Sequence, residues 1–190
     1  MKERILLIED DPQQSSSIKA AIERRYRDLE VEVLETESEF CDRLAVLRVQ
    51  DPKPRMVICD VMLPWSFPDP DAPIAPADVQ EGTFRKAGLR CWRRFRRHKH
   101  LESVPWIYFT VLDERTIEYE AHSDNRTGYA QKSSSIKPLL EEMEEYLHVD
   151  DDWTETDEQV TQRLLSSPKM RNILLDGLSA PISDCATSLP

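Results

Sequence analysis

Short apolar runs alternate with amphipathic stretches along the first two-thirds of the chain. Residues 4–8, 56–59 and 106–109 are runs in which almost every side chain is apolar, which is typical of strands covered on both faces. Weaker runs at 31–34 and 127–131 bring the number of predicted strands to five. The spacing of these runs leaves room for a helix after most of them.

Apolar residues between these runs recur every three or four positions, as on one face of a helix. We predict helices that open at Pro12 and span about 40–47, 85–99 and 135–148, with a weaker polar one near 113–122. Strands that alternate with helices predict an α/β fold with a parallel sheet and helices on both faces. In such sheets ligands bind beyond the carboxyl ends of the strands.

Two segments break this alternation. Residues 64–78 contain five prolines, which predict an extended loop, and we assign residues 64–80 as a proline-rich insertion. Residues 149–190 follow the last predicted helix and begin with three aspartates. We expect one domain over residues 1–148 and an acidic C-terminal extension with two short amphipathic helices over residues 149–190.

Charge and cysteine content exclude several classes of protein. A net charge of −11 over 190 residues argues against nonspecific binding to nucleic acid. No apolar run approaches the roughly 20 residues of a membrane span. The N-terminus leads into only four consecutive aliphatic residues, so we do not expect a secretory signal. The four cysteines form no CxxC pair, which indicates neither zinc nor disulfides and fits a reducing cytoplasm.

Carboxylates follow two of the predicted strands. Glu9 and Asp10 end the first, and Asp60 ends the third, so the fold predicts that they share one pocket. Crowded like charges raise one another's pKa, and a bound Mg²⁺ relieves the conflict because it prefers oxygen ligands. An aspartate beside Mg²⁺ is a candidate acceptor for a phosphoryl group, and Thr110 and Lys132 are candidates to contact that group.

Five separated motifs occur in an order that resembles the receiver domain of two-component response regulators, a flavodoxin-like fold. They are Ile5-Leu6-Leu7-Ile8-Glu9-Asp10-Asp11-Pro12, Cys59-Asp60-Val61-Met62-Leu63-Pro64, Phe109-Thr110, Tyr129 and Lys132. The resemblance covers about residues 3–148, and the spacing from Thr110 through Tyr129 to Lys132 agrees with the family.

The resemblance implies a role for each of these residues. Asp60 would be the phosphoacceptor, with Glu9, Asp10, Asp60 and the Met62 carbonyl as Mg²⁺ ligands. Thr110 and Lys132 would contact the phosphoryl group, and Tyr129 would be a rotating switch residue. A histidine kinase or phosphotransfer protein would be the donor. The output would pass through a downstream protein or through self-association by residues 149–190, in the cytoplasm and without a DNA-binding output domain.

Two departures from the family leave an alternative open. Ser133 follows Lys132 where the family has a proline, and the proline-rich insertion replaces a short Asp-Gly loop after the acceptor. Both favour a pseudo-receiver that acts as an interaction scaffold and is never phosphorylated. An enzyme of the haloacid-dehalogenase type would need a second aspartate where Met62 stands, so we do not expect an enzyme.

Two charged stretches have more than one interpretation. Glu9, Asp10 and Asp11 could form an acidic helix start instead of a metal site. Basic residues crowd the stretch 85–99, which could bind an acidic partner or nucleic acid. We favour the interpretation in which its arginines form ion pairs with acidic residues elsewhere in the chain.

Overall fold

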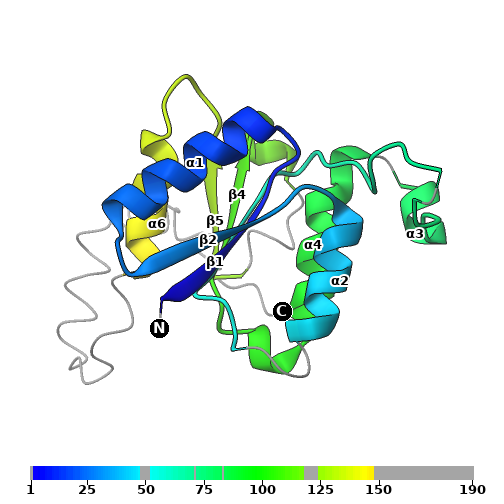
Figure 1. The fold of residues 1–190 in the computed structure, drawn as a ribbon, viewed down its shortest axis with the longest axis horizontal. Helices are drawn as coiled ribbons and strands as arrows, with labels where there is room; N and C mark the ends of the chain where they lie inside the picture. The colour runs from blue at the N-terminus through cyan, green and yellow to red at the C-terminus, as the bar shows by residue number, and fades with distance from the viewer. Residues whose placement is uncertain (1, 48–51, 71, 83, 118–123, 148–190) are drawn as a thin grey trace, which may run out of the picture. The chain divides into compact units, whose positions relative to one another are not determined.

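Five parallel strands form one sheet in the order β2-β1-β3-β4-β5 (Figure 1). The computed structural model describes residues 2–47, 52–70, 72–82, 84–117 and 124–147. The strands are β1 (Glu3–Ile8), β2 (Leu29–Leu34), β3 (Met56–Cys59), β4 (Trp106–Thr110) and β5 (Thr127–Gln131). The predicted α/β fold with a five-stranded parallel sheet is confirmed.

Helices cover both faces of this sheet, also as predicted. Helices α1 (Pro12–Arg25) and α6 (Lys137–Leu147) pack on one face, and α2 (Glu37–Leu47) and α4 (Ala87–Arg96) pack on the other (Figure 1). The shorter helical turns are α3 (Ala77–Gln80), η1 (Phe84–Lys86), η2 (Lys99–Leu101) and η3 (Glu114–Thr116). The two helices predicted within residues 149–190 lie outside the described residues.

Strand β1 shows why the sheet requires continuous aliphatic runs. Ile5 and Leu7 belong to the hydrophobic cluster under α1 and α6, whereas Leu6 and Ile8 belong to the cluster under α2 and α4. Each of the four is at most 1% exposed. Because successive side chains of a strand point to opposite faces, the part of a central strand that lies between two helical layers is apolar on both faces.

Aromatic rings fill the core on the α2 and α4 side. The Trp106 ring of β4 stands edge-on to Phe40 of α2, with centroids 5.9 Å apart, and lies 5.5 Å from Phe95 of α4. Tyr108 continues this cluster along β4, 6.0 Å from Trp106. Tilted and edge-on pairs are the favourable geometries for aromatic rings, so these contacts fix α2 beside α4.

The proline-rich segment contains a helical turn that the sequence did not predict. Residues 64–78 were expected to be loop throughout, but α3 begins at Ala77. Pro76 has extended dihedral angles, and its carbonyl accepts hydrogen bonds from the amides of Val79 and Gln80, both at 3.0 Å. Pro76 belongs to the proline-rich segment and also precedes the helical turn, because its fixed φ suits the entry to a helix.

Residues 113–117, the described part of the polar helix expected near 113–122, form no α-helix. Residues Glu114–Thr116 form only a 3₁₀ turn, capped by the Asp113 side chain, which accepts a hydrogen bond from the Arg115 amide at 2.9 Å. Ile117 has extended dihedral angles, so no helix continues through it. The remaining positions of that prediction, 118–122, lie outside the described residues.

The basic stretch forms ion pairs within the chain, as we favoured. Arg90 and Arg94 of α4 both contact the carboxylate of Glu37, and the Arg96 guanidinium Nε lies 2.6 Å from Asp124 Oδ2. The stretch is not one continuous helix, because η1 precedes α4 and His98 is extended before η2. Intramolecular pairing therefore accounts for three of its arginines.

Two exclusions made from the sequence agree with the described residues. Within those ranges no helix combines the length and the apolar character that crossing a bilayer requires. Cys41, Cys59 and Cys91 are free thiols.

We predict that the substitution Tyr108→Phe raises the free energy of unfolding by about 1 kcal/mol. The Tyr108 side chain is 1% exposed, and no hydrogen-bond partner for its hydroxyl exists among the residues described. Denaturant unfolding measures the change. Tyr129→Phe is the matched control, because the Tyr129 hydroxyl donates to the Leu112 carbonyl at 2.6 Å and its loss should destabilise the fold by about 1 kcal/mol. Equal destabilisation by both substitutions would contradict the prediction.

Candidate functional site

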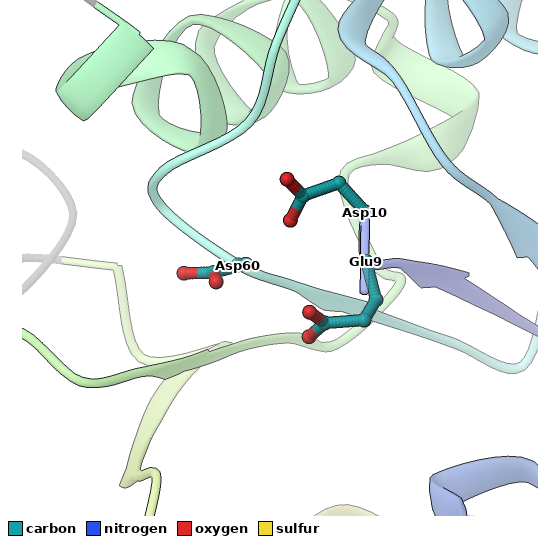
Figure 2. Close-up of side chains that lie close together, drawn as sticks. All are labelled: Glu9, Asp10 and Asp60. Atoms are coloured by element: carbon teal, nitrogen blue, oxygen red, sulfur yellow. The ribbon is translucent and has the colours of Figure 1, made fainter. Parts of the chain in front are cut away.

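Three carboxylates meet at the carboxyl edge of the sheet (Figure 2). Ile8 of β1 lies opposite Cys59 of β3, so the residues that follow these two positions emerge side by side. The Asp60 amide donates to the Ile8 carbonyl at 2.9 Å and continues the ladder by one step. One carboxylate oxygen from each of Glu9, Asp10 and Asp60 lies within 4.8 Å of the others. The predicted convergence of these residues is therefore present.

Lys132 supplies the positive charge of this cluster. Its Nζ lies 2.6 Å from Asp60 Oδ2 and 2.7 Å from Glu9 Oε2. Glu9 is 1% exposed and Asp60 is 6% exposed, so little solvent reaches the pairs. The backbone fixes Lys132 as well, because its amide donates to the Thr110 carbonyl at 2.8 Å. The serine that follows Lys132 does not keep the lysine out of the pocket.

Burial and crowding perturb the acids of the pocket. Desolvation raises the pKa of Glu9 to about 6, against the lowering effect of Lys132, and the nearby charge of Asp60 adds to the rise. The pKa of Asp10 is also raised, first by burial and then by Asp60. Burial alone would lower the pKa of Lys132, but Asp60 and Glu9 outweigh it and the pKa is raised. Lys132 is therefore a permanent cation here.

The geometry of Asp60 is set by its own backbone. Its Oδ1 accepts hydrogen bonds from the amides of Val61 at 2.6 Å and Met62 at 3.2 Å. Its Oδ2 is held by Lys132 on the other side. Two backbone amides orient Oδ1 and the buried Lys132 ammonium orients Oδ2, which is the electrostatic preorganisation that chemistry at this carboxylate would require.

The donor set suits Mg²⁺. Three carboxylates against one ammonium leave an excess of negative charge in a largely buried space, and a divalent cation would compensate it. Oxygen ligands from one or two carboxylates, together with carbonyls and waters, are what Mg²⁺ takes in proteins. Glu9, Asp10 and Asp60 could provide the carboxylates. The Met62 carbonyl, in the loop that follows β3, could provide a further oxygen ligand.

The side chains of Thr110 and Tyr129 both bond to the backbone of Leu112. The Thr110 side chain is fully buried at the end of β4, and its Oγ1 accepts a hydrogen bond from the Leu112 amide at 3.4 Å. The Tyr129 hydroxyl donates to the Leu112 carbonyl at 2.6 Å, and its half-buried ring packs against the core on the α2 and α4 side. Leu112 links the two predicted switch residues, a connection that only the folded backbone reveals.

Asp11, the third acidic residue of the first motif, has a separate role. It is the N-cap of α1, where its Oδ1 accepts hydrogen bonds from the amides of Gln13 at 2.8 Å and Gln14 at 3.1 Å. The interpretation of these acids as a helix start is therefore correct for Asp11. It does not describe Glu9 and Asp10, which face Asp60.

Gly88 brings α4 against the loop that follows β3. Its amide donates to the Val61 carbonyl at 3.0 Å. A Cβ atom at this position would lie 2.3 Å from the Asp60 carbonyl oxygen and 2.8 Å from the Val61 Cα. Only glycine allows this approach, so the first turn of α4 rests directly on the backbone of Asp60 and Val61.

We predict that Glu9 lowers the stability of the metal-free protein as the pH rises. The pKa of Glu9 is 4.5 ordinarily and about 6 in the fold, so the folded state holds this proton more tightly than the unfolded state. Stability contributed by the protonated form is therefore lost between these two values and stays lost above pH 6. At about 1.4 kcal/mol per pKa unit, the loss approaches about 2 kcal/mol.

The measurement is denaturant unfolding of the wild type and Glu9→Gln in chelator across this pH window. The stability of Glu9→Gln relative to wild type should increase from the acidic to the neutral end. A difference that does not change with pH would contradict the prediction.

No family model and no curated protein matches the sequence, but several solved structures match the fold. The response regulator TrrA from Thermotoga maritima, in complex with Mg²⁺-BeF, is 18% identical with a TM-score of 0.54, over 76% of this chain and 99% of that chain. The non-phosphorylated HemR receiver domain from Leptospira biflexa is 18% identical with a TM-score of 0.56, over 80% of this chain and 98% of that chain.

A solved complex of TrrA with the histidine kinase ThkA also matches, at 18% identity and a TM-score of 0.52, over 76% of this chain and 98% of that chain. At these identities the likeness concerns the fold. The part of the chain that the structure describes therefore has the fold of response-regulator receiver domains, as its motifs indicated.

Proposed function

We propose that this chain is a phosphorylation-dependent signalling protein in which Asp60 accepts a phosphoryl group. One observation carries the proposal: oxygens of Glu9, Asp10 and Asp60 lie within 4.8 Å of one another, with Lys132 in contact with Asp60. Phosphoryl transfer asks the protein mainly for positioning and for compensation of charge. The pocket offers both around a single aspartate.

Each residue of the pocket has a role in this proposal. Glu9, Asp10, Asp60 and the Met62 carbonyl hold Mg²⁺, which when bound neutralises charge on the phosphoryl oxygens. An oxygen of Asp60 attacks the phosphorus of a phosphohistidine; the P–N bond breaks, and the imidazole leaves with its electron pair and takes up a proton. Lys132 then pairs with a phosphoryl oxygen, a charge-assisted contact stronger than a neutral hydrogen bond.

Leu112 supplies a route from the pocket to the surface. In the described conformation Thr110 Oγ1 is engaged with the Leu112 amide, and the Tyr129 hydroxyl is engaged with the Leu112 carbonyl. A Thr110 hydroxyl that turns toward a phosphoryl oxygen gives up its bond to Leu112. The segment after β4 then shifts, and the Tyr129 hydroxyl loses its acceptor, the Leu112 carbonyl. One covalent charge thereby biases a two-state element.

The proposed partners are proteins. The donor is a histidine kinase or a phosphotransfer protein; in support, TrrA, which this chain resembles in fold, forms a complex with the histidine kinase ThkA. The output passes through a downstream protein or through self-association by residues 149–190, in the cytoplasm. Nucleic acid fits poorly, since the net charge is −11 and three arginines of the basic stretch are occupied by carboxylates.

A pseudo-receiver scaffold is the second candidate. The observation that favours it is the insertion after the acceptor, which is anchored to the rest of the fold and which phosphoryl transfer does not require. The Ser38 amide of α2 donates to the Trp65 carbonyl at 2.8 Å, and Arg94 Nη2 of α4 lies 2.6 Å from Asp78 Oδ2. A scaffold would use such a lobe for binding and leave Asp60 unmodified.

Incubation of the full chain with Mg²⁺ and a small acyl phosphate separates the two candidates. We expect the protein to gain the mass of one phosphoryl group, and we expect Asp60→Asn to gain none because the acceptor oxygen is gone. Intact-mass spectrometry measures the increment. Chelation of Mg²⁺ should abolish it in the wild type as well.

Asp11→Asn is the matched control, since asparagine caps a helix about as well as aspartate and Asp11 is not part of the pocket. This variant should be labelled like the wild type. An unlabelled wild type, under conditions that label an ordinary receiver, would reject the phosphoacceptor and favour the scaffold.

A further inference from the structure

Glu37 is a fully buried carboxylate outside the acceptor pocket, with 0% exposure at the first position of α2. We propose that Glu37 is a positioning residue that holds the acceptor segment, residues 60–65, from two sides. Its functional consequence rests on the proposed role of Asp60, but its structural part does not. The two sides are its backbone amide and its side chain.

The backbone contact lies at the end of the acceptor segment. The first amides of a helix have no partner within the helix and are free to bind elsewhere. The Glu37 amide donates to the Pro64 carbonyl at 3.0 Å, and the Ser38 amide donates to the Trp65 carbonyl at 2.8 Å. The start of α2 thus fixes the chain just after the Met62 carbonyl that we assign to the metal.

The side-chain contact reaches the other side of the segment through α4. The Glu37 carboxylate accepts hydrogen bonds from Arg90 Nε at 2.9 Å and Arg90 Nη2 at 2.6 Å, and it also accepts one from Arg94 Nη1. Arg90 is itself 8% exposed. A two-point contact between a guanidinium and a carboxylate fixes orientation as well as distance.

The first turn of α4 transmits this contact to the acceptor. Gly88, two residues before Arg90, donates its amide to the Val61 carbonyl at 3.0 Å and leaves no room for a Cβ against the Asp60 carbonyl. A shift of α4 therefore moves the backbone of Asp60 and Val61. The amides of that backbone orient Asp60 Oδ1, so Glu37 acts on the acceptor through Arg90 and Gly88.

The same network extends into the insertion. Arg94, which contacts Glu37 with Nη1, places its Nη2 at 2.6 Å from Asp78 Oδ2 in α3. Asp78 is exposed at 57% of its side chain, whereas Glu37 is not exposed at all. The pair with Asp78 is therefore the screened, weak end of the network, and Glu37 is its buried centre.

The substitution Glu37→Gln tests the proposal because it keeps the size of the side chain and removes the charge. In the metal-free protein, we expect the amide resonances of Val61 and Met62 to shift in ¹H–¹⁵N spectra, since these amides report the geometry around Asp60 Oδ1. With Mg²⁺ as the titrant, we expect about tenfold weaker binding than in the wild type, the usual effect of losing a residue that orients metal ligands.

Asp124→Asn is the matched control. Asp124 also pairs with an arginine of α4, Arg96, and its side chain is 22% exposed, but its other side-chain hydrogen bonds go to Arg126 and Thr127 and not to residues 60–65. It should leave the Val61 and Met62 amides in place and change the Mg²⁺ affinity by less than about twofold, as expected for a distant site. The double substitution Glu37→Met/Arg90→Met replaces the buried pair by apolar groups. It is the second test if Glu37→Gln does not fold, and it should move the same amides.

Unmoved Val61 and Met62 amides in a folded Glu37 variant would overturn the proposal. An equal shift of these amides in Asp124→Asn would also overturn it, because general loosening of α4 would then explain the effect. A wild type that binds no Mg²⁺ would reject the metal site and with it the proposed function. The metal-free spectra would still decide whether Glu37 positions the acceptor segment.

Discussion

The burial of several like charges at one edge of the sheet is the constraint on which the rest of this structure depends. Glu9 and Asp60 are almost inaccessible to water, and they share one ammonium group, that of Lys132. Ionised groups removed from water are costly unless a counter-charge is in contact with them. Lys132 reaches them only if β5 pairs with β4 and β4 pairs with β3. The charge balance of the pocket therefore depends on the order of the strands in the sheet.

The two faces of the sheet meet this requirement in different ways. The face under α1 and α6 is packed mainly by aliphatic side chains such as Ile22 and Leu139. The other face combines the aromatic cluster around Trp106 with the buried carboxylate of Glu37. Charge and ring contacts are directional, so in our proposal α2 and α4 position the segment of residues 60–65.

The sequence predicted those features that depend on local pattern or on spacing along the chain. Central strands are uniformly apolar because both of their faces are buried, so Ile5–Ile8 could be found without a structure. Lys132 could be placed through the resemblance to receiver domains, because its spacing from Thr110 and Tyr129 agrees with that family. Glu37 could not, because Glu37-Ser38-Glu39 has the polar composition of a solvated helix start, and its partner Arg90 is 53 residues away. Leu112 acts through its backbone, which leaves no signal in the side-chain pattern.

The proline-rich insertion was the feature hardest to reconcile with an acceptor site, and its attachment resolves the difficulty. A hydrogen bond from the Leu63 amide to the Phe84 carbonyl joins the residues on either side of the insertion, so the loop is closed where it leaves the fold, near Asp60. Each doubling of the length of a closed loop costs only about 0.6 kcal/mol, so the length of the insertion adds little strain to the site. What the site requires is that residues 60–65 stay in place, and Glu37 is bound to both ends of that segment, directly at Pro64 and through α4 at Val61. In our proposal, the base of the insertion is therefore held by the same contacts that position Asp60.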